Sequence, residues 1–351
     1  MKYFMGVCCA MLLGLSACGD IDSPEFPPSE VKSEVKEAVD FSYTELENLE
    51  STHGMHLNYH NRVYVLSADI VLDSPYQSFS SFAGNPYFIS LEEFIDIGYL
   101  TKEECNEINF GENISSIDYG SLYKNRYTLL NKAYKRSDIS KDSKFQSFVN
   151  QNSYWLDDYA LFMAVKNKFN GSTWTEWNED IKLRTSEAIE RYSYELSEEI
   201  EFQKFMQFHF YLQWNKLKTY VNSKGIKIIG DIPIYVAFDS ADAWANPQLF
   251  QFDENNTPIA VAGCPPDGFS ATGQLWGNPL YKWDYHKKTD YKWWISRLSH
   301  CFNLYDVLRI DHFRGFDEYY SIPYGADNAI NGHWEKGPGM DIFKAIKKVL
   351  G

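Results

Sequence analysis

Apolar residues in the second half of the chain recur at helical spacing and then give way to short, unbroken apolar runs. Between Glu201 and Lys224 apolar side chains stand three to five positions apart, and Gly225 follows, a residue that readily takes the positive φ of a helix end. The run 226–232 holds four isoleucines with few polar breaks, which predicts a strand buried on both faces. Asp231 stands at the carboxyl end of this predicted strand.

The same order of elements recurs further along the chain. A predicted helix around residues 293–298 is followed by an apolar run over 305–310 and then by Asp311. A helix, a buried strand and an acid at the strand's exit are typical of a (β/α) barrel, whose reactive groups gather at the carboxyl ends of its strands. We therefore predict an α/β fold of the (β/α)8 type, with a helical insertion over 91–200 and a long loop region over 239–286 that covers the site.

The N-terminus carries a pattern of its own. Lys2 precedes an apolar run from Tyr3 to Leu15, and small residues then lead to Cys18. A basic start, a hydrophobic stretch too short to span a bilayer and small residues before a cleavage point are typical of a secretory signal. Residues 15–18, Leu-Ser-Ala-Cys, resemble a bacterial lipobox, in which the cysteine is acylated. The alternative is a hydrophobic helix with a chance cysteine.

We accordingly expect three segments. Residues 1–18 are interpreted as a lipoprotein-like signal peptide, and residues 19–72, whose first part is rich in Ser, Pro and Glu, as a tether with an unassigned stretch. Residues 73–351 form the main body. The signal peptide predicts a membrane-anchored lipoprotein. We expect membrane contact only through the acyl group on Cys18.

Composition narrows the class of partner. Hydrophobic residues at 44% and charged residues at 23% are close to the globular average. With 48 acidic against 33 basic residues, the net charge of −15 repels a phosphate backbone, so we expect no nucleic-acid partner. Aromatic residues reach 17%, and flat rings with polar edges suit stacking on sugars, although most of them must fill the core.

Neither a disulfide framework nor a metal site is predicted. Beyond residue 18 the only cysteines are Cys105, Cys264 and Cys301, too few and too scattered for a framework. Histidines at positions 53, 56 and 60 have a spacing that could bind Zn²⁺ from one helix face, but the glycine and asparagines among them disfavour a helix. We expect three solvated histidines there and no cofactor.

The chemistry-bearing pair is Arg309 and Asp311. Strand residues two apart project to the same face, so this guanidinium and carboxylate stand together. The cation favours the ionised carboxylate, which is the form that a nucleophile needs, and His312 adds a hydrogen-bond donor. Taken alone, such a pair is more often a structural ion pair.

Five separated segments favour the catalytic interpretation. In their order along the chain they resemble the bacterial 4-α-glucanotransferases, known as amylomaltases or disproportionating enzymes, of glycoside hydrolase family 77 in the α-amylase superfamily. The resemblance extends from about Asp73 to Gly351. The segments are 73–79, 154–162, 230–236, 264–281 and 309–314.

The resemblance implies a retaining transfer of α-1,4-glucan segments between maltooligosaccharides. Asp311 is implied to be the nucleophile that forms a covalent glucosyl intermediate, and Arg309 to orient and ionise it. Asp231 and His312 are implied to bind hydroxyls of the donor sugar. Asp231 has a structural alternative as a helix cap.

Three further residues are implied to contact the glucan. Gln274 and Trp276 belong to the loop that arches over the substrate, and Tyr76 resembles a stacking platform on the acceptor side. Trp276 has a structural alternative, as a ring that only fills the core.

The sequence departs from the family's pattern at both ends. Retaining chemistry needs a second carboxyl group, and the Glu that the family carries after the strand following Asp311 has no counterpart up to Gly351. The family's first barrel strand is replaced by Arg62–Leu72, which we do not expect to act as a substitute strand. We therefore expect a truncated or rearranged member, a barrel incomplete at both ends, and impaired transfer.

Two alternatives to an active transferase stay open on this evidence. One is a membrane-tethered protein that binds glucan without catalysis, and the other is a gene fragment without function. The resemblance also implies a cytoplasmic location, whereas the signal peptide predicts membrane anchoring. We expect the location that the signal peptide predicts.

Overall fold

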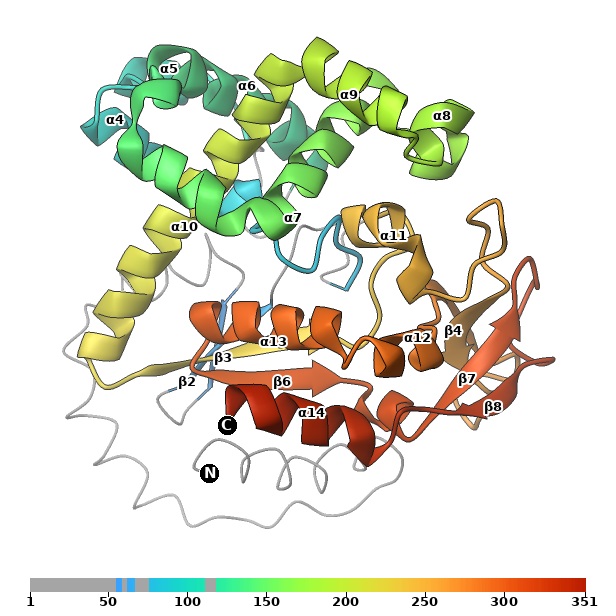
Figure 1. Ribbon diagram of the computed structural model, residues 1–351. Helices are drawn as coiled ribbons and strands as arrows, with labels where there is room; N and C mark the ends of the chain where they lie inside the picture. Colours follow the sequence, from blue (N-terminus) through green and yellow to red (C-terminus); the bar gives the residue numbers. More distant parts are fainter. Residues whose placement is uncertain (1–54, 59–61, 67–75, 111–117) are drawn as a thin grey trace, which may run out of the picture.

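The computed structural model of the chain describes residues 55–58, 62–66, 76–110 and 118–351. A layer of helices covers one side of the molecule, and two small sheets with their flanking helices form the other (Figure 1). Helix α10, residues Ser197–Ser223, runs out of the helical layer and leads directly into the central strand β3.

The helical layer is built by residues that precede β3. Its longest members, α7 and α10, pack along each other. The side chain of Asp142 begins α7 by accepting a hydrogen bond from the backbone N–H of Lys144 at 2.7 Å. Besides α10, the helices are α4 Leu91–Asp96, α5 Lys102–Asn106, α6 Tyr119–Arg136, α7 Ser143–Lys168, α8 Glu179–Lys182 and α9 Ser186–Glu195.

The helix expected over 201–224 is confirmed as α10, but one of its expected core residues is exposed. It ends at Ser223, and Gly225 takes the expected positive φ of 77°. Phe202, Phe205 and Phe208 are buried, but Leu212 is 45% exposed. Leu212 follows the helical period but is exposed, because the second half of α10 leaves the helical layer that buries the first half.

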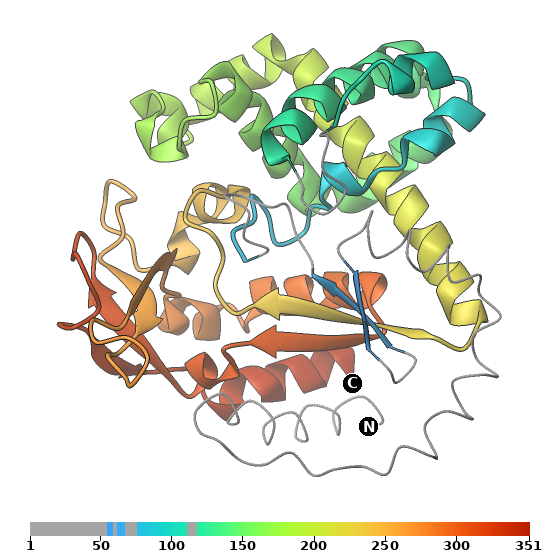
Figure 2. The ribbon, with the colours of Figure 1, turned by 180° about the vertical axis from the view of Figure 1, so that it is seen from behind.

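The first sheet contains the predicted strand after α10. β3 spans Lys227–Pro233, and every residue from Ile228 to Ile232 is buried, as expected for a central strand. β6 spans Val307–Asp311 and pairs with β3 in parallel, with both carboxyl ends at the same edge (Figure 2). β6 is half exposed rather than buried on both faces, because it lies at the edge of this sheet.

The expectation that Arg62–Leu72 supplies no strand was wrong. Residues Arg62–Leu66 form β2, which pairs in parallel with β3, and Met55–Asn58 form β1, antiparallel to β2. The β-prone run Val-Tyr-Val-Leu supports this pairing. Within the described residues the sheet has four strands, in the order β1-β2-β3-β6, and does not close into a barrel.

The second sheet is antiparallel and lies beyond the carboxyl ends of β3 and β6. Its order is β5-β4-β7-β8. The region 239–286, expected to be a long loop, contributes two of its strands and two short helices, because its polar turns alternate with apolar runs that pair across the sheet. The elements are α11 Ala241–Ala245, β4 Ala260–Cys264, β5 Gln274–Pro279, α12 Trp283–Lys288, β7 Glu318–Pro323 and β8 His333–Lys336.

Two helices flank the first sheet. α13 spans Lys292–Leu304 and α14 spans Met340–Leu350, and the two pack together. Behind β3 the ring of Tyr305 lies 2.1 Å from the point where a Cβ on Gly230 would stand, so only glycine fits there. Of the helices in the described part of the chain, none combines the length and apolar character that crossing a membrane requires.

Candidate active site

The carboxyl ends of β3 and β6 bring three charged side chains together. Asp231 is the register partner of Arg309 in the parallel pair, and Pro233 is that of Asp311. The Nη1 of Arg309 donates to Oδ2 of Asp231, and its Nη2 donates to Oδ1 of Asp311 at 2.8 Å. Asp231 is only 5% exposed, whereas the side chain of Asp311 is 39% exposed. The guanidinium therefore joins a buried carboxylate to an accessible one.

The charges of this cluster depend on one another. Burial raises the pKa of Asp231, and the nearby Asp311 adds to this rise while Arg309 opposes it. Burial disfavours the charge on Arg309, but the carboxylates of Asp231 and Asp311 outweigh it and raise its pKa. The cation is therefore what allows two carboxylates to stand side by side.

Tyr76 closes the cluster on the side of Asp231. Its hydroxyl donates to Oδ2 of Asp231 at 3.3 Å. Burial first, and then the carboxylates of Asp231 and Asp311, raise the pKa of Tyr76, so the phenol keeps its proton and acts as a donor.

His312 lies in a tight turn directly after β6. Its backbone is left-handed, with φ at 50°, and a Cβ on Gly315 would approach its ring to 3.4 Å. Within the described residues its buried Nε2 has no hydrogen-bond partner. Burial lowers the pKa of His312, although Asp311 opposes this. A neutral imidazole is therefore expected at pH 7, with one ring nitrogen left for an external partner.

The second sheet carries the remaining predicted residues to the same place. The ring of Trp276, on β5, meets the ring of His312 edge to face, with centroids 4.8 Å apart. The Nε1 of Trp276 donates to Oε1 of Gln274 at 3.0 Å. These contacts join the seven predicted residues into two groups, which meet at the peptide bond between Asp311 and His312. The first group is Tyr76, Asp231, Arg309 and Asp311, and the second is His312, Trp276 and Gln274.

Other predictions fall elsewhere. Cys18 lies outside the described residues, as do His53 and His60. The described part of the chain holds no group of three or more His, Cys, Asp or Glu side chains that could bind a metal ion. Cys105, Cys264 and Cys301 are unbridged.

Tyr235 also lies at this site, although it was not among the residues predicted from the sequence. Its buried ring lies 6.3 Å from that of His312 and 6.4 Å from that of Trp276, so it supports both. The signal that could have identified it is its place in the segment 230–236, four residues after Asp231.

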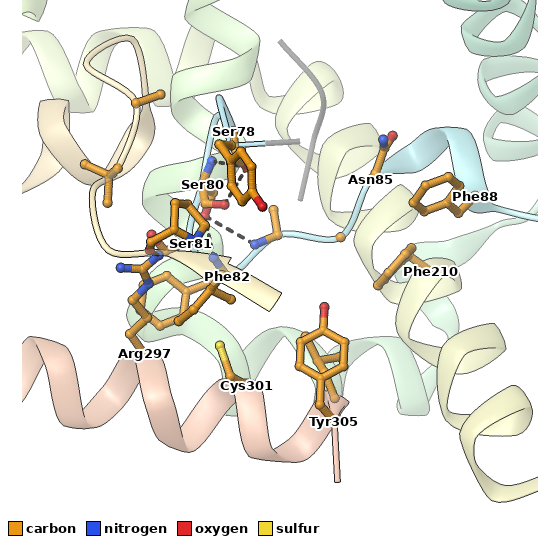
Figure 3. A pocket seen from close by; sticks show the side chains of 18 of the residues that line it. Ser78, Ser80, Ser81, Phe82, Asn85, Phe88, Phe210, Arg297, Cys301 and Tyr305 are labelled. Atoms are coloured by element: carbon orange, nitrogen blue, oxygen red, sulfur yellow. Dashed lines mark hydrogen bonds between the residues drawn. The ribbon is translucent and has the colours of Figure 1, made fainter. Parts of the chain in front are cut away.

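A narrow pocket, which Tyr76 helps to line, adjoins the cluster. Figure 3 shows the turn from Ser78 to Phe82 on one side and α13, with Arg297 and Cys301, on the other. Tyr76 lines this pocket, but Asp231, Arg309 and Asp311 do not.

Comparisons with known proteins show which family the chain resembles. A family model described as 4-alpha-glucanotransferase matches residues 38–351. A 4-alpha-glucanotransferase of Clostridium butyricum is 52% identical over 280 residues, which are 80% of this chain and 58% of that protein. A 4-alpha-glucanotransferase of Streptococcus pneumoniae is 46% identical over 292 residues, 83% of this chain and 58% of its own length.

A solved structure is similar as well. The amylomaltase from Streptococcus agalactiae in complex with acarbose has a TM-score of 0.78 and 42% identity, over 83% of this chain and 59% of that chain. The present chain thus spans less than three-fifths of the length of each of these relatives. The family model covers most of the chain, and the chain therefore belongs to the 4-alpha-glucanotransferase family.

Proposed function

We propose that this chain provides the nucleophile side of a site that transfers α-1,4-glucan segments between maltooligosaccharides with retention of configuration. The observation that carries the proposal is the Arg309 guanidinium, which joins the carboxylates of Asp231 and Asp311 at the exits of two neighbouring parallel strands. Membership in the 4-alpha-glucanotransferase family supports it.

In the first step the carboxylate of Asp311 attacks the anomeric carbon of the donor sugar. The glycosidic bond breaks, the downstream sugar leaves with a proton from a general acid, and a glucosyl ester of Asp311 forms. In the second step a hydroxyl of the acceptor sugar attacks the same carbon, gives its proton to the conjugate base of the general acid, and releases the carboxylate of Asp311. Two inversions give net retention. Arg309 keeps Asp311 ionised and aimed, through the 2.8 Å hydrogen bond.

The neighbouring side chains suit a sugar in the donor position. The Nε2 of His312 is buried and without a partner among the described residues, so a sugar hydroxyl would satisfy it. Asp231 offers a carboxylate to further hydroxyls, and the ring of Trp276 offers an apolar face. Gln274 holds the indole of Trp276, and Tyr76 completes the acceptor side. The proposed reaction uses no metal or cofactor.

Two finer points belong to the same proposal. The parallel order β2-β3-β6, with acids at the carboxyl ends of β3 and β6, supports a (β/α)8 barrel of which the described residues form an open part. Retaining transfer needs a second carboxyl group about 5 to 5.5 Å from the nucleophile. The proposed transfer therefore depends on a second carboxyl group besides that of Asp311.

A disproportionation assay on maltotriose tests the proposal. Release of glucose together with longer oligosaccharides supports the transferase. Retention on amylose without turnover identifies a glucan-binding protein instead, and a chain that neither turns over nor binds glucan contradicts both functions. Supplying the downstream part of a relative in trans tests whether the supply of a general acid limits the rate.

We also propose that Cys18 is acylated and anchors the chain to the membrane, on the support of the residues 15–18 alone. Cells grown with radioactive palmitate should yield a labelled chain, and Cys18→Ser should be unlabelled. An unlabelled wild-type chain in the cytoplasm contradicts the anchor.

A further inference from the structure

A buried arginine holds the backbone at the exit of β3. Arg297, on α13, is 2% exposed. Its Nη2 donates to the carbonyl oxygen of Pro233 at 2.7 Å, and its Nη1 donates to that of Ile234 at 3.0 Å. These two carbonyls stand where β3 ends and its pairing with β6 stops.

The fork of the guanidinium matches this task. A buried carbonyl that has left the strand ladder needs a new donor, and a planar guanidinium can serve two neighbouring oxygens at once. The group is held from the side by the rings of Trp293 and Trp294, whose centroids lie 5.6 and 5.0 Å from its Cζ. Figure 3 shows Arg297 on α13, close to Ser81 and Phe82.

The charge on Arg297 also has a counterpart. Asp242, on α11, is buried, and its Oδ2 accepts a hydrogen bond from the backbone N–H of Ser81 at 2.6 Å. The ionised form of Asp242 is favoured by the charge on Arg297. Arg297 therefore belongs to the scaffold that holds both β3 and the turn after Tyr76.

The backbone that Arg297 holds carries the charged cluster. Pro233 is the register partner of Asp311, and Asp231 lies two residues before it on the same strand. The side chain of Ile234 lies 2.9 Å from the position of a Cβ on Gly315, in the turn that holds His312. A shift of the β3 exit would therefore move Asp231 against Asp311 and disturb the His312 turn.

We propose that Arg297 is a positioning residue of the glucan site, which fixes the β3 exit and thereby sets the spacing between Asp231 and Asp311. The proposal deepens the proposed function and rests on it for its consequence in binding. Arg297 is separated from the charged cluster by the β3 exit and acts only through it.

Hydrogen exchange and calorimetry on the full chain test this role. Arg297→Lys keeps the charge but loses the fork, and Arg297→Met loses both. The matched control is Arg126→Met, because Arg126 is partly buried and also donates to a backbone carbonyl, that of Ile89, but in the helical layer. All variants are measured at a temperature at which circular dichroism shows them folded.

We expect faster amide exchange in Arg297→Lys over 229–235 and 309–315, with the helical layer unchanged, and acarbose affinity reduced by about tenfold. Arg126→Met should speed exchange only in the helical layer and keep the affinity within about twofold. If Arg297→Met does not fold, Arg297→Lys alone decides.

The outcomes separate this proposal from the proposed function. Unchanged exchange at the β3 exit, or exchange raised equally in the helical layer, overturns the positioning role even if the affinity falls. Local exchange at the β3 exit with unchanged acarbose affinity overturns it as well. A wild-type chain that binds no acarbose counts against the proposed function, and exchange at the β3 exit then decides whether Arg297 fixes the strand.

Discussion

Asp231 on β3 and Arg309 on β6 stand opposite each other in a parallel strand pair, and the guanidinium donates a hydrogen bond to the buried carboxylate. The register of the strands creates this contact. A slip of β6 by one residue would place Ile310 there and turn the charged face away. The site therefore depends on the pairing of two strands that lie 78 residues apart in the sequence.

We expect Asp311→Asn to reduce transfer from maltotriose by about 10³-fold or more, because the amide cannot form the glucosyl ester. Initial rates of glucose release measure this. The control is Asp306→Asn at the other end of β6, where the carboxylate accepts a hydrogen bond from the backbone of Ile228 at 2.8 Å. That variant should lose stability and keep its transfer rate. Undiminished transfer in Asp311→Asn would remove the residue from its role.

The elements with strong local patterns could be predicted from the sequence. β3 carries a continuous apolar run, and α10 a sustained helical period ending at a glycine, so both were identified with errors of a few residues. The residues of the candidate site were predicted because the segments that hold them are distinctive, and the structure brings the rings of Trp276 and His312 into contact.

Other features depend on contacts that a local pattern does not contain. β2 has a β-prone sequence, but its partner β3 lies more than 150 residues away. The segments that form β4 and β5 lie among Gly, Pro and Asn residues typical of loops. They form strands because they pair with each other and because β4 also pairs with β7. The burial of Arg297 could not be predicted from its local sequence either, because an arginine in an amphipathic helix normally faces solvent.

Removing the indole of Trp276 should weaken glucan binding. We expect Trp276→Ala to raise the dissociation constant for acarbose by about tenfold, because the variant loses an apolar face and its edge-to-face contact with His312. Isothermal titration calorimetry measures the change. Phe269→Ala is the control, since Phe269 is 77% exposed and makes no ring contact among those described. Equal losses in both variants would contradict a specific role for Trp276.

The buried carboxyl of Asp242 should make stability depend on pH in a defined direction. Burial raises its pKa to about 6, against the hydrogen bond from Ser81 and the charge of Arg297. In the unfolded chain its pKa is about 3.9. Between these pH values the folded chain binds more protons, so this group's contribution to the free energy of unfolding falls as pH rises from about 4 to about 6.

Asp242→Asn does not titrate and can still accept from Ser81. Relative to wild type, we expect its free energy of unfolding to rise by about 3 kcal/mol between pH 4 and pH 7. Urea denaturation at both pH values measures the difference, and Asp253→Asn, in an exposed turn, serves as the control. A difference between Asp242→Asn and wild type that stays constant with pH would show that the buried carboxyl has an ordinary pKa.

The contact between Gly230 and Tyr305 sets how close the chain packs behind the site. A Cβ at position 230 would lie 2.1 Å from the Tyr305 ring, so Gly230→Ala forces the ring or β3 to move. We expect a loss of about 1 to 3 kcal/mol in the free energy of unfolding. Gly268→Ala, where a Cβ meets nothing within 4 Å, should be close to neutral. In the double variant Gly230→Ala with Tyr305→Leu the smaller side chain relieves the clash. The double variant should therefore lose less free energy of unfolding than the sum of the losses of the two single variants. Strict additivity in this cycle would mean that the ring of Tyr305 does not determine the need for glycine at position 230.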